Sequence, residues 1–372
     1  MSTMSTMSTV GRIVGAASIA TGLVGAAALG GVTAQRRAVR RFRLPDGTDP
    51  KGYDALVADR TYSVVGEDGV VLHVEEVGPP DALLTVIFGH GWTLRSGAWH
   101  YQRIGLAGNG FGDPDDGPPA RLVFFDQRSH GRSGRADPAH VGMEDLAGDL
   151  AAVLATAAPH GPVVLVGHSM GGMALITLAG LRPNLFTERV AGVGLISTAA
   201  TARSGAPLHR SLVSSSSVLL RLAGIAANRY PTWIERGRSS SRDAVWLLTR
   251  TLGFAGRNVP GDLVDYLDEM ISGTPLDVIT DFVPALISLD RSTALPVLET
   301  LPVVVICGDA DRQTPVDRSR AIAEALPDAE LVIIPGAGHM AILEAPDVVN
   351  EALRRLFRRA LEFSSSPALK SG

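Results

Sequence analysis

The stretch Val163-Val164-Leu165-Val166-Gly167-His168-Ser169-Met170-Gly171-Gly172 decides the fold of this chain. Its four leading apolar residues predict a strand that is buried on both faces. The small residues that follow, as far as Leu181, predict a helix packed closely on that strand. Ser169 is therefore expected at a strand-to-helix turn. Glycines at 167 and 171 suit this turn, because a side chain at either position would collide with the neighbouring strand or helix. The pattern predicts a nucleophilic serine.

Such a serine needs two partners, since its hydroxyl is unreactive at neutral pH until a base takes the proton and an acid orients the base. Two loops late in the chain supply candidates. The apolar run 303–306 precedes a loop with Asp309 and Asp311, and the run 331–334 precedes a loop that ends at His339. Asp311 is preferred as the acid, whereas Asp309 lies nearer its strand and is expected to brace the turn. His339 is the predicted general base.

Composition excludes several function classes. The 372 residues are 45% hydrophobic and 19% charged, which is typical of a soluble core. With a net charge of −4 the folded part has no basic face to neutralise phosphates, so we expect no nucleic-acid partner. Cys307 is the one cysteine, so neither an intrachain disulfide nor a cysteine-rich metal site is possible. We interpret this cysteine as a small buried hydrophobe at a strand end.

The N-terminal residues 1–43 form a separate segment. A threefold Met-Ser-Thr repeat precedes residues 13–35, which carry no charge and are followed by five arginines. This length can span a bilayer as a helix, although many alanines and glycines make the segment weakly hydrophobic. We prefer a membrane anchor that leaves the catalytic domain in the cytoplasm, because arginines favour that side. A cleaved export signal and a surface helix or arm of a soluble cytoplasmic protein are the alternatives.

Short apolar runs alternate with helical patterns through the rest of the chain. This alternation predicts a mostly parallel sheet wound by helices, with the ligand site beyond the carboxyl ends of the strands. We assign residues 44–197 and 294–363 to this core and residues 364–372 to a disordered tail. The runs that predict strands before and after the nucleophile are 61–65, 70–77, 83–88, 122–125 and 190–196.

Residues 198–293 lack strand patterns and contain helical stretches instead. We interpret them as a helical lid inserted over the carboxyl edge of the sheet. The aromatic residues of this segment either line an apolar substrate pocket or, more commonly for such residues, form the small core of the insertion. They are Tyr230, Trp233, Trp246, Phe254, Tyr266 and Phe282.

Two further loops follow predicted strands. The loop Gly89-His90-Gly91-Trp92-Thr93 can turn its backbone N–H groups toward the site, so the N–H of Trp92 is a candidate for half of an oxyanion hole. The cluster 126–134 combines charged residues and glycines. We expect it to tie its strand end to the nucleophile turn by hydrogen bonds, with His130 in a structural role.

From about Thr61 to Leu361 the chain resembles the α/β-hydrolase superfamily. The matching motifs occur in the order of that family: His90-Gly91-Trp92, residues 126–133, residues 167–172, Gly308-Asp309-Ala310-Asp311 with Pro315, and Gly338-His339. The resemblance implies an α/β-hydrolase fold with a helical cap insertion. It also implies a triad of Ser169, Asp311 and His339, with the N–H groups of Trp92 and Met170 as the oxyanion hole. Ser129 stands where many members have glycine.

The expected activity is acyl transfer to water. His339 takes the proton of Ser169 as the serine attacks a carboxylic ester, or a related acyl bond, of a largely apolar small molecule or lipid. No metal or organic cofactor is needed. A serine nucleophile disfavours the epoxide-hydrolase and haloalkane-dehalogenase chemistries, which use aspartate. Alternatives are cofactor-free perhydrolysis as in haloperoxidase-like members, aminopeptidase or acyltransferase activity, and a low-turnover ligand-binding or sensing protein.

Overall fold

A computed structural model describes residues 52–53, 56–107, 120–202, 242–256 and 258–365. Its centre is an eight-stranded sheet with the strand order β1-β2-β4-β3-β5-β6-β7-β8. β2 is antiparallel to β1 and β4, and all other neighbouring strands are parallel. This confirms the predicted mostly parallel sheet. The strands are β1 (Arg60–Val65), β2 (Val71–Val77), β3 (Thr85–Gly89), β4 (Arg121–Phe125), β5 (Val163–His168), β6 (Val190–Ile196), β7 (Val303–Gly308) and β8 (Glu330–Ile334).

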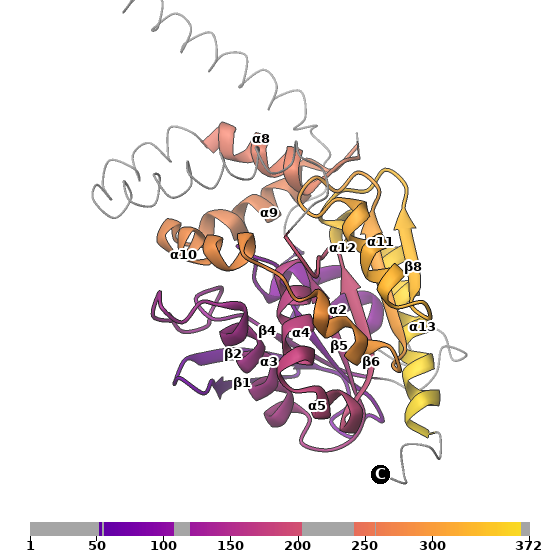
Figure 1. Ribbon diagram of the computed structural model, residues 1–372. Helices are drawn as coiled ribbons and strands as arrows, with labels where there is room; N and C mark the ends of the chain where they lie inside the picture. Colours follow the sequence, from indigo (N-terminus) through magenta and orange to yellow (C-terminus); the bar gives the residue numbers. More distant parts are fainter. Residues whose placement is uncertain (1–51, 54–55, 108–119, 203–241, 257, 366–372) are drawn as a thin grey trace, which may run out of the picture.

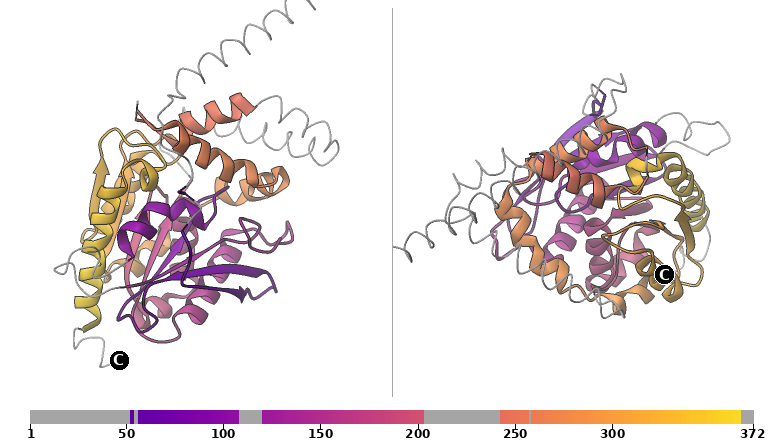
Figure 2. Two further views of the ribbon diagram at one scale, coloured as in Figure 1. Left: turned by 180° about the vertical axis from the view of Figure 1, so that it is seen from behind. Right: turned by 90° about the horizontal axis from the view of Figure 1, so that it is seen from above.

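Helices cover both faces of this sheet (Figures 1 and 2). One core contains buried residues of α3 (Met143–Ala157), α4 (Met170–Leu181) and α11 (Val316–Ala325). The core on the opposite face contains those of α2 (His100–Leu106) and α13 (Pro346–Ser365). Shorter elements complete these layers: η1 (Ser96–Trp99), α5 (Pro183–Glu188), η4 (Ser292–Leu298) and α12 (Ala341–Glu344).

Burial on both faces explains why the sequence of the central strand β5 is continuously apolar. Val163 and Leu165 belong to one core and Val164 and Val166 to the other, because successive side chains of a strand point to opposite faces. All four are at most 1% exposed. Burying each of them contributes about 1.5–3 kcal/mol, so this strand is held firmly up to the turn that carries Ser169.

Three helices of the insertion lie above the carboxyl ends of the strands (Figure 1). They are α8 (Arg242–Gly253), α9 (Gly261–Gly273) and α10 (Leu276–Ile287). An isolated antiparallel bridge between Thr201 and Asp290 joins the two ends of the insertion where it leaves the sheet. Residues 203–241, which include Tyr230 and Trp233, lie outside the described part of the chain.

The predicted N-terminal segment 1–43 and residues 366–372 also lie outside the described residues. Within the described part, no single helix is long and apolar enough to cross a membrane. The helices α9 and α10 reach the required length and composition only as a pair, and they are bent by 90° at the break between them. Both helices bury side chains inside the protein.

Candidate active site

Ser169 occupies the sharp turn between β5 and α4. Its backbone angles are φ 50° and ψ −117°, a strained conformation for a residue with a side chain. A Cβ atom on Gly167 would lie 2.5 Å from the Cα of Gly172, and one on Gly171 would lie 2.2 Å from the carbonyl oxygen of Gly89. The turn can therefore form only because both flanking positions are glycine, as the sequence pattern predicts.

Several residues with a strained backbone conformation lie along this edge of the sheet. The described non-glycine residues with positive φ are Thr93, Ser129, Ser169 and Ser197, and they follow the neighbouring strands β3, β4, β5 and β6. Each such residue costs about 1–3 kcal/mol. Ser129 has a φ of 64°, in the region that favours glycine: its N–H donates to the carbonyl of Gly134 (2.9 Å), and its hydroxyl accepts from the N–H of Ala136 (2.9 Å).

The structure brings Asp311, His339 and Ser169 into one hydrogen-bonded chain. Nε2 of His339 lies 3.1 Å from Oγ of Ser169. Nδ1 of the same imidazole lies 2.9 Å and 3.1 Å from the two carboxylate oxygens of Asp311. Because the carboxylate only accepts, Nδ1 carries the proton and Nε2 presents its lone pair to the serine hydroxyl.

The carboxylate of Asp311 is oriented by its own loop. Oδ1 accepts from the N–H groups of Gln313 and Thr314, each at 2.9 Å, and Oδ2 accepts from the hydroxyl of Thr314 at 2.8 Å. Burial alone raises the pKa of Asp311, but His339 and the Thr314 donors outweigh it and lower the pKa below its usual value. Asp309 is exposed and accepts from the N–H of Gly336 (2.7 Å), which matches its predicted bracing role.

The loop after β3 lies against Ser169. A Cβ atom on Gly91 would be 2.9 Å from Nδ1 of His168 and 3.2 Å from Cβ of Ser169. Within the described residues, the backbone N–H groups of Trp92 and Met170 have no hydrogen-bond acceptor. Both predicted donors therefore remain available beside the serine, as an oxyanion hole requires.

The cluster 126–134 holds this β3 loop, which corrects the expectation that it would bind the nucleophile turn. The N–H of Gln127 donates to Nε2 of His90 (2.9 Å), and the N–H of Thr93 donates to Nε2 of His130 (3.1 Å). The reason is strand order, because β4 pairs with β3 and β3 separates it from β5. Burial lowers the pKa of His130 to about 3, so its imidazole is a neutral acceptor.

A cavity of about 680 Å³ contains Ser169 and His339. Loops at the carboxyl edge of the sheet and aliphatic side chains of the insertion helices both line it. These side chains are Leu248, Leu252, Leu267, Ile271, Ile279, Leu286 and Ile287.

The aromatic residues considered for this cavity lie elsewhere. Trp246, Phe254, Tyr266 and Phe282 are at most 5% exposed and belong to the two cores. The pocket alternative is therefore wrong for these four. Large flat rings fill the space between the helices and the sheet, whereas the aliphatic residues of the same helices face the cavity.

Glu344 is a residue of the site that sequence reasoning missed. Its carboxylate accepts from the N–H of Gly338 (2.6 Å), next to His339, and from the N–H of Ala255 (3.1 Å) in the insertion. Met340 also donates its N–H to the carbonyl of Gly253 (2.8 Å). The histidine loop is thus held against the insertion, and the residues involved are too far apart in sequence to form a recognisable motif.

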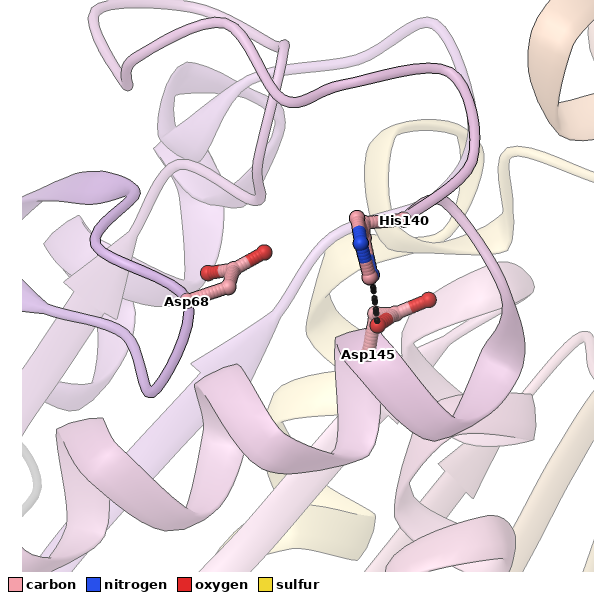
Figure 3. Close-up of side chains that lie close together, drawn as sticks. All are labelled: Asp68, His140 and Asp145. Carbon is pink, nitrogen blue, oxygen red and sulfur yellow. Dashed lines mark ion pairs between the residues drawn. The ribbon is translucent and has the colours of Figure 1, made fainter.

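One group of side chains has the composition of a metal site. Ligand atoms of Asp68, His140 and Asp145 lie within 4.8 Å of one another (Figure 3). Arg128 already supplies positive charge here, with Nη1 2.8 Å from Asp68 and 3.9 Å from Asp145. The same guanidinium donates to both oxygens of the buried Asp149. The cluster is therefore explained by this arginine, and we assign no metal to it.

The mostly parallel sheet, with a serine at a strand-to-helix turn and an acid and a histidine on later loops, defines an α/β-hydrolase type of protein. Residues 86–352 match the alpha/beta hydrolase family, and the chain belongs to that family. The protein is accordingly a hydrolase.

Relatives include lipases, esterases and haloperoxidases. A monoacylglycerol lipase from Mycolicibacterium smegmatis is 26% identical over 317 residues, which cover 79% of this chain and 92% of the lipase. A thermophilic esterase from Thermogutta terrifontis superposes with a TM-score of 0.63 at 25% identity, covering 81% of this chain and 99% of the esterase. A non-heme haloperoxidase from Rhodococcus erythropolis is 34% identical over 109 residues, 29% of this chain and 35% of that protein.

Proposed function

We propose that this hydrolase cleaves carboxylic esters of largely apolar small molecules or lipids through a Ser169-His339-Asp311 triad. The observation that carries the proposal is the continuous hydrogen-bonded chain from Asp311 through His339 to Ser169, at the wall of a cavity lined by aliphatic side chains. The likeness to a monoacylglycerol lipase and to an esterase supports an ester substrate.

The first half of the reaction forms an acyl-enzyme. Nε2 of His339 takes the proton as Oγ of Ser169 attacks the ester carbonyl, and Asp311 stabilises the imidazolium that results. The N–H groups of Trp92 and Met170 bind the oxyanion. Removing one such donor typically raises the barrier by about 2.7–4 kcal/mol. The tetrahedral intermediate then collapses, His339 protonates the departing alcohol oxygen, and the acyl group stays on Ser169.

The second half releases the acid. Water enters after the alcohol leaves, His339 takes a proton from it, and the hydroxide attacks the acyl carbonyl within the same oxyanion hole. Collapse of the second tetrahedral intermediate breaks the bond to Oγ, and His339 returns the proton to Ser169. The aliphatic walls favour an apolar acyl or alkyl chain, because burying its surface contributes about 25 cal/mol per Å².

The test is hydrolysis of p-nitrophenyl esters from acetate to palmitate by the full chain and by Ser169→Ala. Triad removal typically lowers kcat by a factor of about 10⁶, so the variant should fall to background. A fluorophosphonate should label the wild type and spare the variant. Equal rates in the two proteins would reject Ser169 as the nucleophile.

The same experiment separates the alternatives. Peracid formation from acetate and hydrogen peroxide, at a rate above that of ester cleavage, would favour perhydrolysis, the direction suggested by the haloperoxidase likeness. Cleavage of amino-acid p-nitroanilides would favour an aminopeptidase. Labelling of Ser169 without turnover of any ester would favour a ligand-binding or sensing protein.

A further inference from the structure

The insertion contacts the loop that carries the proposed oxyanion donor, the backbone N–H of Trp92. The hydroxyl of Thr274, at the C-terminal end of α9, lies 3.2 Å from the carbonyl oxygen of Thr93. This carbonyl is the nearer of its two acceptors, because the carbonyl oxygen of Met270 in the same helix lies at 3.4 Å. Thr274 is buried, so solvent does not compete for its hydroxyl. The insertion therefore holds the residue that directly follows Trp92.

Thr93 has a backbone conformation that needs such support. Its φ is 65°, and a residue with a side chain stays in this region only when its surroundings hold it there. Its N–H donates to Nε2 of His130 (3.1 Å), and its own hydroxyl donates to the carbonyl of Trp92 (2.6 Å). With the bond from Thr274, every backbone polar group of Thr93 has a partner.

The peptide group between Gly91 and Trp92 is fixed as well. Nε2 of His90 accepts from the N–H of Gln127 (2.9 Å), so Nδ1 carries the proton and donates to the carbonyl of Gly91 (2.8 Å). This carbonyl and the N–H of Trp92 belong to one planar peptide group. From the carbonyl of Gly91 to that of Thr93, the N–H of Trp92 is the one backbone group without a partner among the described residues.

A second contact from the insertion reaches the same loop through His130. The ring of Phe282 in α10 lies edge-on against that imidazole, with ring centroids 5.1 Å apart and an interplanar angle of 68°. Both residues are buried. Thr93 is thus tied to the insertion twice, directly at its carbonyl and through His130 at its N–H.

We propose that Thr274 is a positioning residue for the oxyanion hole, which acts through Thr93 on the N–H of Trp92. The inference rests on the proposed ester hydrolysis at Ser169. Donors that are already oriented stabilise the transition state without reorganisation, so their placement affects the chemical step. A change in the φ of Thr93 would shift the N–H of Trp92 relative to Ser169. The insertion would then set the rate of the reaction in addition to lining the cavity.

The experiment compares three variants of the full chain in the hydrolysis of p-nitrophenyl butanoate. Thr274→Val keeps the branched shape and removes the hydroxyl, so kcat should fall about tenfold at nearly unchanged KM. This fall is smaller than the loss of about 10²–10³-fold for a missing donor, because the bonds from His90 and to His130 remain. Thr274→Ser keeps the hydroxyl and should stay within about threefold of the wild type.

Thr280→Val is the matched control. This threonine of α10 also lies in the insertion, and its hydroxyl donates to the carbonyl of Asp277 (2.9 Å). The control should keep the wild-type kcat. Equal losses in Thr280→Val and Thr274→Val, or in Thr274→Ser and Thr274→Val, would overturn the inference, because the loss would not follow the hydroxyl at position 274.

A thionoester separates a role in the oxyanion hole from a general structural role. In O-(4-nitrophenyl) thiobutanoate, sulfur replaces the carbonyl oxygen and accepts hydrogen bonds only weakly. The ratio of kcat/KM for the oxygen ester to that for the thionoester should therefore fall about tenfold in Thr274→Val and stay unchanged in Thr280→Val. An equal fall for both substrates would leave this ratio unchanged and would reject the positioning role.

The outcomes also separate this inference from the proposed function. Rapid ester cleavage by Ser169 with a wild-type kcat in Thr274→Val would reject the role of Thr274 alone. If the wild type cleaves no ester, amide hydrogen exchange of a peptide covering residues 91–96 still tests the contact. Exchange of this peptide should be faster in Thr274→Val than in the wild type and in Thr280→Val. Equal exchange in the three proteins would reject the inference even if the proposed function had also failed.

Discussion

Substituting Gly171 by alanine tests whether the turn of the proposed nucleophile Ser169 and the loop of the proposed oxyanion donor Trp92 depend on their close packing. The added Cβ atom would lie 2.2 Å from the carbonyl oxygen of Gly89 and 2.8 Å from that of His90. The shorter distance is more than 1 Å below the 3.4 Å at which ordinary contact begins. Both obstacles are backbone atoms, so the clash cannot be relieved by rotating a side chain.

The size of the expected loss in kcat depends on which atoms the clash displaces. Gly89 and His90 lead directly into the loop that carries the N–H of Trp92, so relief of the clash displaces this donor by about 1 Å. A misplacement of that size costs about 10²-fold in rate, and loss of one oxyanion donor costs about 10²–10³-fold. We expect kcat to fall by this factor, which corresponds to about 2.7–4 kcal/mol of barrier. Overpacking should also lower the free energy of unfolding by about 1–3 kcal/mol.

The assay is ester hydrolysis by Gly171→Ala beside the wild type, with urea unfolding of both proteins. Gly148→Ala in α3 is the matched control, because a Cβ atom there would meet no heavy atom within 4 Å. This control should keep wild-type activity and gain about 0.5–1 kcal/mol of stability from lower chain entropy. A Gly171→Ala enzyme within threefold of the wild-type kcat would refute the inference that the close approach of Gly171 to Gly89 positions the Trp92 N–H.

Three further predictions concern groups around the site. Asp149→Asn removes the buried carboxylate that accepts two hydrogen bonds from Arg128 and leaves the more exposed Asp68 as its close acidic partner, so it should lower the free energy of unfolding by about 1.5–3 kcal/mol in urea. Asp317→Asn should cost less than about 1 kcal/mol because that carboxylate is exposed. The lowered pKa of Asp311 means that its charge stabilises the fold above the unfolded pKa of about 3.9, and that this stabilisation disappears as pH falls through the folded value. The stability deficit of Asp311→Asn should therefore be full at pH 7 and shrink as the pH falls below about 3.9. Burial raises the pKa of Cys307 to about 12, so iodoacetamide at pH 8 should leave the folded enzyme unlabelled and active and should label it in urea.

The strands and the nucleophile turn could be predicted because their causes are local. The apolar run of β5 is continuous since both faces of one strand are covered, and residues 163–166 alone show this. The glycines at 167 and 171 reflect a steric requirement of the turn between them. Asp311 and His339 could be proposed as partners because parallel strands end at a common edge, whichever strand neighbours which.

Contacts between segments that are far apart in the sequence decided the loop contacts and the cavity walls. Because β4 pairs with β3, the loop 126–134 contacts the β3 loop instead of the Ser169 turn. No residue in the loop 126–134 indicates, in the sequence alone, that β4 pairs with β3. Helical periodicity shows that α8, α9 and α10 are amphipathic, yet only packing determines that their aliphatic residues face the cavity while Trp246 and Phe282 fill the cores.

The sequence by itself therefore determined the fold class and was enough to propose the reacting groups, and the tertiary structure alone decided what surrounds them. Turn sterics and strand patterns act between residues that are adjacent in the chain, so they can be read one segment at a time. Cavity walls are made by side chains that meet across the fold. Arg318 looks like an ordinary helix residue in the sequence, and it becomes part of the cavity only because α11 packs beside β7 beneath the insertion helices.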